Sequence, residues 1–390
     1  MQRANVTDAV TRLGTEGAFA VLARARALEA EGLDVIHLEI GEPDFETPPH
    51  VAEAGIAAIR AGETHYCQTA GLPVLREAAA ASLAWSRDVP VDPQNVLVAS
   101  GAKPFLFFTV LATCGPGDEV IYPDPGFPIY ESAVRFAGAT PIPLPLREER
   151  KFSFDPAELE SLLSESTRLV ILNAPQNPTG GVIPAADLER AAAAILRTPA
   201  WVLTDEVYSR ITYDVEAPSI ASLPGMLERT ILLDGFSKTF AMTGWRLGYA
   251  AVPAELVDPL TRLIVNSTSC VPPFVQLAGV AALEGPQDAV GKMVAEFRRR
   301  RDYLVPALNE IPGISCVEPG GAFYAFPNVS GLPIDADEVA DRLLGEAGVA
   351  LLAGSAFGRH ATDHLRLSYA ASLETLEQAI SRIETFVKAL

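Results

Sequence analysis

The chain has 390 residues, of which 49% are hydrophobic and 20% charged, a composition typical of a globular protein with a large core. Its formal net charge of −19 argues against nucleic acid and anionic membranes as partners, because both attract clustered lysine and arginine. The longest apolar run, Phe105 to Cys114, is too short to span a bilayer, and charged positions interrupt any signal-peptide core near the N-terminus. We therefore expect a cytoplasmic protein with neither a membrane nor a nucleic-acid partner.

The numbers and positions of the cysteines and lysines limit which metal, disulfide and amine sites the chain can form. The four cysteines are dispersed, with no Cys-x-x-Cys pair and no nearby histidine cluster, so we expect neither a metal site nor a disulfide framework. Of the 30 basic residues only five are lysines, so candidates for amine chemistry are few. The lysines are Lys103, Lys151, Lys238, Lys292 and Lys388.

The first elements in chain order are a helix over 18–30, ended by Gly32, and a short strand over 35–40. From about residue 50 to residue 270, helical patterns alternate with short apolar runs bounded by turn residues. This alternation predicts an α/β fold, with a mostly parallel central sheet flanked by helices on both faces. The strands are expected at 96–99, 119–122, 169–172, 201–204 and 230–233.

Each expected strand breaks into polar or glycine-rich sequence where it ends. Gly101, Asn173, Asp205 and Asp234 all stand at or just beyond such an end. Open parallel sheets bind ligands beyond the carboxyl ends of their strands. The sequence therefore predicts a ligand site at this edge of the sheet.

The pattern changes from about residue 285 onward. A basic helix over 292–308, a turn at 320–324 leading into a strand, and a final helix after Leu373 indicate a smaller α+β domain. We expect three parts: an N-terminal segment, 1–45, that contributes to the small domain, a large ligand-binding domain, 46–284, and a small C-terminal domain, 285–390.

Lys238 is the first candidate for chemistry. It follows a buried strand and lies among glycines and aromatic residues, a poor place for a solvated charge. Desolvation lowers the pKa of a lysine and frees the neutral amine for Schiff-base formation. A structural ion pair is the alternative interpretation of the same position.

The segment from Ser237 to Tyr249 resembles the cofactor-lysine motif of class I and II aminotransferases, pyridoxal 5′-phosphate (PLP) enzymes of fold type I similar to aspartate aminotransferase. Further motifs follow the order of that family over nearly the whole chain. They are Gly41-Glu42-Pro43-Asp44-Phe45, Tyr66 with Gly71-Leu72-Pro73 and Leu75-Arg76-Glu77, Pro116-Gly117-Asp118-Glu119-Val120, Asn177-Pro178-Thr179-Gly180, Asp205-Glu206-Val207-Tyr208 and Leu365-Arg366-Leu367-Ser368.

The resemblance implies catalytic roles around the cofactor ring. Lys238 would form the Schiff base with PLP and then act as the base that moves the substrate proton. Asp205 would hold the pyridine nitrogen protonated, and Asn177 and Tyr208 would hydrogen-bond the phenolic oxygen. Phe127 would stack on the ring without the hydrogen bond that a tryptophan could donate.

The resemblance also implies a phosphate site. Small residues and a helix N-terminus favour close approach of backbone amides to an anion. Gly235 stands where many members of the family carry a second serine, so one hydroxyl contact would be missing. The residues expected around the phosphate are Gly101, Ala102, Lys103, Ser237, Arg246 and, from the partner subunit of a homodimer, Tyr66.

Arg366 would bind the α-carboxylate of the substrate through two parallel hydrogen bonds, with Asn177 and the Gly41 backbone as further contacts. Lys103 falls where some bacterial aspartate aminotransferases bind the side-chain carboxylate of the substrate. Its ammonium would equally suit the cofactor phosphate. The substrate side-chain pocket could also involve residues around 266–270.

The resulting hypothesis is a PLP-dependent aminotransferase with ping-pong kinetics, acting on amino acids and 2-oxo acids and of possible aspartate or glutamate type. A PLP-dependent lyase is the alternative, because the same residues support either reaction. A DNA-binding regulator is disfavoured, since only about forty residues precede Gly41 and the charge is negative. A nicotinamide-dependent dehydrogenase is disfavoured because no Gly-x-Gly-x-x-Gly follows an early strand.

Overall fold

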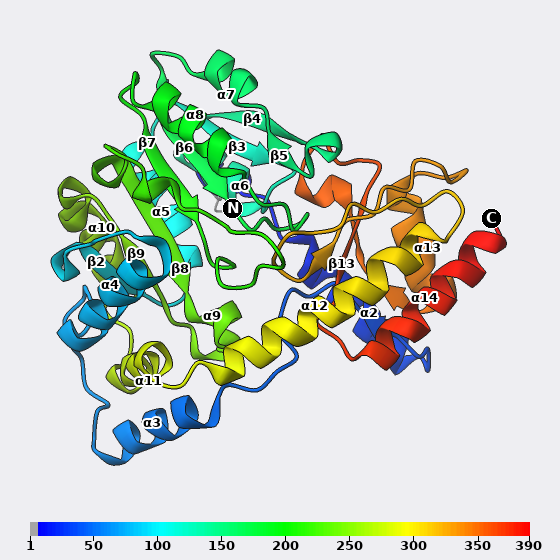
Figure 1. Cartoon of the computed structure of the whole chain (residues 1–390), viewed down its shortest axis with the longest axis horizontal. Helices are drawn as coiled ribbons and strands as arrows, with labels where there is room; N and C mark the ends of the chain where they lie inside the picture. The colour runs from blue at the N-terminus through cyan, green and yellow to red at the C-terminus, as the bar shows by residue number, and fades with distance from the viewer. Residues whose placement is uncertain (1–6) are drawn as a thin grey trace, which may run out of the picture.

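The computed structural model describes residues 7–390 and confirms the predicted α/β architecture (Figure 1). Its main sheet has eight strands in the order β2-β9-β8-β7-β6-β3-β4-β5. The strands from β4 through β3, β6 and β7 to β8 are parallel, whereas β9 is antiparallel to both β8 and β2. Their bounds are β2 (Val96–Ala99), β3 (Glu119–Asp124), β4 (Thr140–Arg147), β5 (Ser153–Phe154), β6 (Thr167–Asn173), β7 (Trp201–Asp205), β8 (Thr230–Gly235) and β9 (Gly248–Ala251).

Helices cover both faces of this sheet, because successive side chains of each strand point to opposite faces. In β8, Ile231 and Leu233 pack in the core on one face, whereas Leu232 packs in the core on the other. The helices on the first face are α5 (Lys103–Thr113), α6 (Ile129–Ala137) and α10 (Ala254–Ser267). Those on the second face are α4 (Pro73–Arg87), α7 (Pro156–Leu162), α8 (Ala185–Ile195) and α11 (Pro273–Glu284), with α3 (Pro49–Arg60) packed against α11.

Strand β4 was not expected from the sequence, because Pro141, Pro143 and Pro145 interrupt its apolar run. Proline cannot donate a hydrogen bond to the ladder and is confined to positions near a sheet edge. β4 meets this condition: it pairs with β3 on one side, while β5 covers only Leu146 and Arg147 on the other. Three prolines on alternate residues are therefore compatible with a strand at this place.

A second layer contains two small sheets and the long helices of the C-terminal part. Figure 1 shows α12 running from the main sheet toward α13 and α14. A separate apolar core, which includes Phe297, Leu304 and Phe323, fills this layer. The elements are β1 (Ile36–His37) paired with β11 (Val349–Ala350), β10 (Tyr324–Ala325), β12 (Leu352–Ala353) and β13 (Leu365–Ser368), with α2 (Gly17–Ala30), α12 (Asp288–Asn309), α13 (Ala336–Ala347) and α14 (Leu373–Lys388).

Pairing of β1 with β11 brings the N-terminal segment against the C-terminal part of the chain. The strand expected over 35–40 is limited to Ile36–His37, after which the chain turns through Gly41 toward the main sheet. The boundaries 1–45, 46–284 and 285–390 remain a prediction, and residues 1–6 of the first part lie outside the described residues. Two short helices, α1 (Asp8–Thr11) and α9 (Phe236–Thr239), complete the α-helices of residues 7–390.

None of the helices within residues 7–390 combines the length and the apolar character that crossing a membrane requires.

Candidate active site

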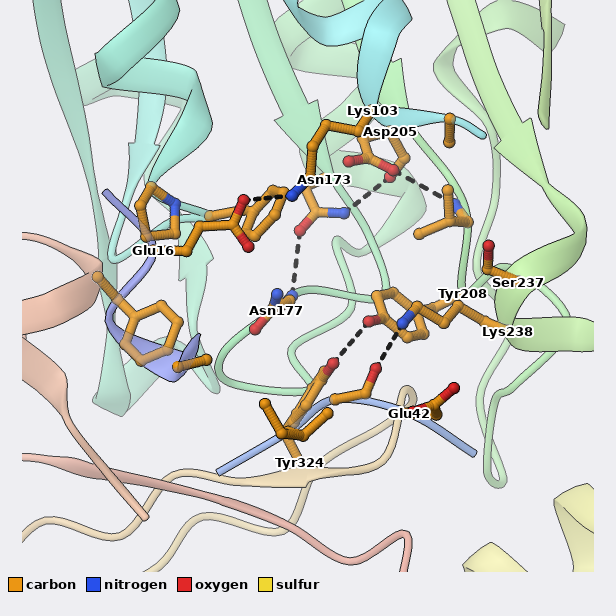
Figure 2. Close-up of a pocket in the computed structure, with 18 of the residues that line it drawn as sticks. Glu16, Glu42, Lys103, Asn173, Asn177, Asp205, Tyr208, Ser237, Lys238 and Tyr324 are labelled. Atoms are coloured by element: carbon orange, nitrogen blue, oxygen red, sulfur yellow. Dashed lines mark hydrogen bonds and ion pairs between the residues drawn. The ribbon is translucent and has the colours of Figure 1, made fainter. Parts of the chain in front are cut away.

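A cavity of about 510 Å³ lies at the predicted edge of the sheet, between the strand ends, the N-terminal segment and β13 (Figure 2). Most of the predicted site residues line this cavity, although their positions in the sequence are far apart. Those that line it are Gly41, Ala102, Lys103, Phe127, Asn177, Asp205, Tyr208, Ser237, Lys238, Arg246 and Arg366. Gly101 does not line the cavity but lies against Arg246, which does, and Tyr66 is not part of the wall.

Lys238 enters the cavity from α9, the single turn of helix that follows β8. Its Nζ donates a hydrogen bond to the carbonyl oxygen of Gly41 over 2.5 Å and lies 5.9 Å from the centre of the Tyr208 ring. Burial lowers the pKa of the Lys238 amine to about 8, against the effect of the Glu42 carboxylate, which raises it. A substantial fraction of the amine is therefore neutral near physiological pH.

This shift predicts selective acylation of Lys238 in the cofactor-free protein. At pH 8 about half of the Lys238 amines should be neutral, against about 0.3% for an ordinary lysine. Peptide mass spectrometry after brief treatment with acetic anhydride should show labelling of Lys238 that rises with a midpoint near pH 8. Exposed Lys292 serves as the reference, and the same pH dependence for both lysines would contradict the prediction.

Asp205 is buried at the end of β7, where its side chain faces the cavity. Tyr130 donates a hydrogen bond to Oδ2 over 2.8 Å, and the Val207 amide donates to Oδ1 over 3.4 Å. Burial raises the pKa of Asp205 to about 6, although both hydrogen bonds lower it. The carboxylate is mostly ionised at neutral pH and is suited to hold a protonated ring nitrogen.

Asn173 connects Asp205 to Asn177, as the dashed lines in Figure 2 show. Its Nδ2 donates to the Asp205 carbonyl oxygen over 2.8 Å, and its Oδ1 accepts from the Asn177 amide over 3.1 Å. Because Asn173 ends β6 directly beside β7, the register of the two strands places it opposite Asp205. The amide of Asn173 thus fixes the loop that carries Asn177.

Arg366 is buried on β13, and its hydrogen bonds go to an amide oxygen and a backbone carbonyl oxygen rather than to a carboxylate. Its Nη1 donates to Asn177 Oδ1 over 3.0 Å, and its Nη2 donates to the Glu39 carbonyl oxygen. The guanidinium lies 4.7 Å from the centre of the Tyr324 ring and 4.9 Å from that of Phe357. Nε is buried without a hydrogen-bond partner. A buried cation whose donors are not all used favours an anionic ligand.

The wall opposite Asp205 depends on Tyr208, Tyr324 and Gly41. The two tyrosine hydroxyls are 2.7 Å apart, so one donates to the other inside the buried site. A Cβ at Gly41 would lie 2.0 Å from the hydroxyl oxygen of Tyr324, which only a glycine avoids. This close approach also allows the Gly41 carbonyl to reach Lys238.

The remaining wall is formed by the N-terminus of α5 and by Arg246. Gly101 has a φ of +92°, and a Cβ there would lie 2.5 Å from Arg246 Nη2. Arg246 Nη1 donates to the Thr243 carbonyl oxygen over 2.8 Å, and Ser237 lines the same part of the cavity. Gly235, which replaces the expected second serine, also faces it. Positive charge and a helix N-terminus together suit a phosphate group.

Lys103 forms an ion pair with Glu16, and its Nζ lies 5.2 Å from the centre of the Phe127 ring. Both members of this pair line the cavity. Sequence reasoning singled out Lys103 but not its acidic partner, because Glu16 precedes it by 87 residues and belongs to no motif.

Three other contributors were not predicted from the sequence. Asn173 was noted as the end of a strand but was assigned no role, although its position beside Asp205 was a usable signal. Tyr130 and Tyr324 have no local sequence signal, since only the packing of α6 and β10 brings them to the site.

Tyr66 is 89% exposed and does not contact this cavity, so its contribution to a partner subunit remains a prediction. Cys67, Cys114, Cys270 and Cys316 are free thiols. Within residues 7–390, no three His, Cys, Asp or Glu side chains are grouped so that they could hold a metal ion.

The residues that surround the cavity fit PLP. An amine of lowered pKa, an ionised carboxylate, and a basic pocket at a helix N-terminus match its aldehyde, ring nitrogen and phosphate. The glycine at position 101 allows the Arg246 guanidinium to lie against the backbone, where a Cβ would displace it. Lys238, Asp205 and the group of Ala102, Ser237 and Arg246 would hold the three parts of the cofactor.

Comparison with known proteins gives the same answer. Residues 33–383 match the model for aminotransferase class I and II. An aspartate aminotransferase from Geobacillus stearothermophilus is 39% identical over 387 residues, covering 97% of this chain and 98% of its own length. Two crystal structures are similar as well. One is the aspartate aminotransferase from Thermus thermophilus with maleate, at a TM-score of 0.94, 36% identity and full coverage of both chains. The other is the alanine aminotransferase from Pyrococcus furiosus, at a TM-score of 0.93, 32% identity and coverage of 99% and 100%.

Sequence, fold and comparisons therefore agree, and the expected PLP-dependent aminotransferase activity is confirmed over a PLP-dependent lyase. The chain belongs to the class I and II aminotransferases, the PLP-dependent enzymes of fold type I.

Proposed function

We propose that this aminotransferase acts on dicarboxylic substrates of the aspartate and glutamate type. The observation that carries the proposal is that, with Lys238 and Arg246 assigned to the cofactor, two further basic side chains line the cavity, Arg366 and Lys103. Two cations suit the two carboxylates of such an amino acid. The relative from Thermus thermophilus supports this, because its structure contains maleate, a dicarboxylate.

The side chains divide the work as follows. Arg366 and Asn177 bind the α-carboxylate, and Arg366 lies between two aromatic rings that restrict its orientation. PLP, when bound, supplies the electron sink that stabilises negative charge at the substrate Cα. Lys238 holds the cofactor and afterwards moves the proton from Cα. Its pKa near 8 lets the amine accept and release a proton near neutral pH.

Asp205 keeps the ring nitrogen protonated, and Tyr208 with Asn177 contacts the phenolic oxygen. Phe127 supports the ring, while Gly101, Ala102, Ser237 and Arg246 hold the phosphate. We further propose a homodimer in which the exposed Tyr66 of each subunit completes the phosphate site of the other. The cytoplasmic location expected from the sequence remains a prediction.

The test is the half-reaction of the PLP enzyme with single amino acids. The loss of the cofactor absorbance measures its rate. Aspartate or glutamate should convert the enzyme with a higher kcat/KM than alanine or leucine. Lys103→Ala should reduce kcat/KM for the dicarboxylic donors by about 10- to 100-fold, because one charged hydrogen bond is lost, and should change the neutral donors little. Equal losses for both classes would contradict the assignment of Lys103.

A further inference from the structure

We infer that Glu16 is a specificity-determining residue, a built-in counter-ion of Lys103 that the distal carboxylate of a substrate must displace. The inference rests on the proposed role of Lys103 and deepens it. Lys103 attracts dicarboxylic donors, and Glu16 weakens that attraction. Donors with uncharged side chains bind without opening the ion pair.

First, the Glu16 side chain makes no capping hydrogen bond to its own helix. It occupies the N-cap position of α2, where a side chain commonly accepts a hydrogen bond from a backbone amide. Asp335 and Ser372 do so at the start of α13 and α14, but the Glu16 side chain makes no such bond. Its carboxylate is instead paired with Lys103, which also lines the cavity, as Figure 2 shows.

The second support is the partial exposure of the pair. The side chains of Glu16 and Lys103 are 26% and 40% exposed, so water reaches both. An ion pair of this kind is weak, on the order of 1 kcal/mol or less, and can be opened by a competing anion. A fully buried pair would be too costly to separate during each catalytic cycle.

The third support is electrostatic. A distal carboxylate that approaches Lys103 also approaches Glu16, and like charges at short range repel each other. Arg366 does not relieve this repulsion, because the α-carboxylate occupies it in the proposed binding mode. The ammonium of Lys103 has three donors, so it can bind the substrate after Glu16 has turned away.

The fourth support is the apolar lining beside each charge. Leu106 lies one helical turn after Lys103 in α5, and Phe19 lies one turn after Glu16 in α2, and both line the cavity. These side chains can contact an uncharged donor while the ion pair stays closed. The same cavity therefore accepts both classes of donor, and Glu16 sets the ratio between them.

The test replaces Glu16 with glutamine in the PLP-loaded enzyme, which removes the charge and keeps the shape. Glu16→Gln should raise kcat/KM for aspartate by about tenfold, mainly through a lower KM. The kcat/KM for leucine should stay within about twofold of the wild-type value. Succinate, a dicarboxylate without an amino group, should also bind about tenfold more tightly when titrated against the cofactor absorbance. Glu31→Gln is the matched control, since Glu31 is exposed at the end of α2 and lies outside the cavity.

A double-mutant cycle with Lys103→Ala separates this role from a general effect of charge. In the Lys103→Ala background, Glu16→Gln should no longer raise kcat/KM for aspartate or strengthen the binding of succinate. Three results would overturn the inference. They are a lower kcat/KM for aspartate in Glu16→Gln, an equal change of kcat/KM for both donor classes, and an increase for aspartate that persists without Lys103. An enzyme that is inactive with aspartate but gains this activity through Glu16→Gln would contradict the proposed substrate and support the inference.

Discussion

Replacement of Lys238 with alanine is expected to abolish the half-reaction, with a loss of about 10⁴-fold or more in its rate constant. The reason is that the proposed mechanism uses this amine twice, first to hold the cofactor and then to move the Cα proton. No described side chain duplicates it: Lys103 lines the same cavity but is paired with Glu16. Stopped-flow absorbance after mixing with aspartate measures the effect directly.

Two controls keep this result interpretable. The phosphate content of purified Lys238→Ala protein reports whether the cofactor still binds through Arg246, Ser237 and Asp205. A small free amine such as methylamine should restore part of the rate, because it can enter the space left by the side chain. A variant that binds the cofactor and reacts at the wild-type rate would refute the assignment of Lys238.

The largest expected effect on stability belongs to Arg87, the last residue of α4, whose partners Glu206 and Asp234 are the sequence neighbours of Asp205 and Gly235. Its buried guanidinium pairs with Glu206 over 2.9 Å and with Asp234 over 2.5 Å. Burial alone would lower the pKa of Arg87, but the two carboxylates raise it overall. Arg87→Met should therefore reduce the free energy of unfolding by about 3–5 kcal/mol, because two carboxylates stay buried without their cation.

The pH dependence of this loss distinguishes lost charge pairing from lost packing. Burial raises the pKa of Glu206 from its ordinary value to about 6, even with Arg87 present to lower it. A carboxyl whose pKa is raised by folding opposes folding by an amount that grows as the pH rises from its ordinary pKa to the raised one, and that then stays constant. Removal of Arg87 raises that pKa further. The deficit of Arg87→Met should thus shrink as the pH falls from 8 to 5.

Denaturant unfolding at several pH values measures this deficit. Addition of Glu206→Gln and Asp234→Asn to Arg87→Met should recover part of the stability, since no unpaired charge then remains. The exposed Arg262 provides the control, because Arg262→Met should change stability by no more than about 0.5 kcal/mol. If the lower free energy of unfolding of Arg87→Met did not change with pH, the loss of stability would be due to lost packing instead.

The sequence predicted five of the eight strands of the main sheet, and the edge where the site lies, because their apolar runs end in polar or glycine-rich sequence. Asp205 ends β7 and Lys238 lies in the first turn after β8, so their meeting follows from the parallel pairing of these two strands. Strand β9 was not predicted, since three of its four residues, Gly248, Ala250 and Ala251, are small and have little strand preference.

Contributors from outside the main sheet were harder to foresee. Glu16 reaches the cavity from α2, and Tyr324 does so from β10, in the separate layer. Their positions depend on how the two layers pack, which no local pattern in the sequence encodes. The same holds for Tyr130, whose bond to Asp205 joins residues 75 positions apart.

The antiparallel strand β9 has a consequence for the state of the site before the cofactor arrives. It lies between β2 and β8, and Gly248 pairs with Ala99 on one side and with Gly235 on the other. The loop at Gly101 and the turn that carries Lys238 are thus held two interstrand steps apart, about 10 Å, by backbone hydrogen bonds. A side chain at Gly248 would break this arrangement, because its Cβ would lie 2.4 Å from the Ala102 amide nitrogen. These backbone hydrogen bonds fix the spacing within the protein itself, which lowers the entropic cost of ordering the two loops around PLP.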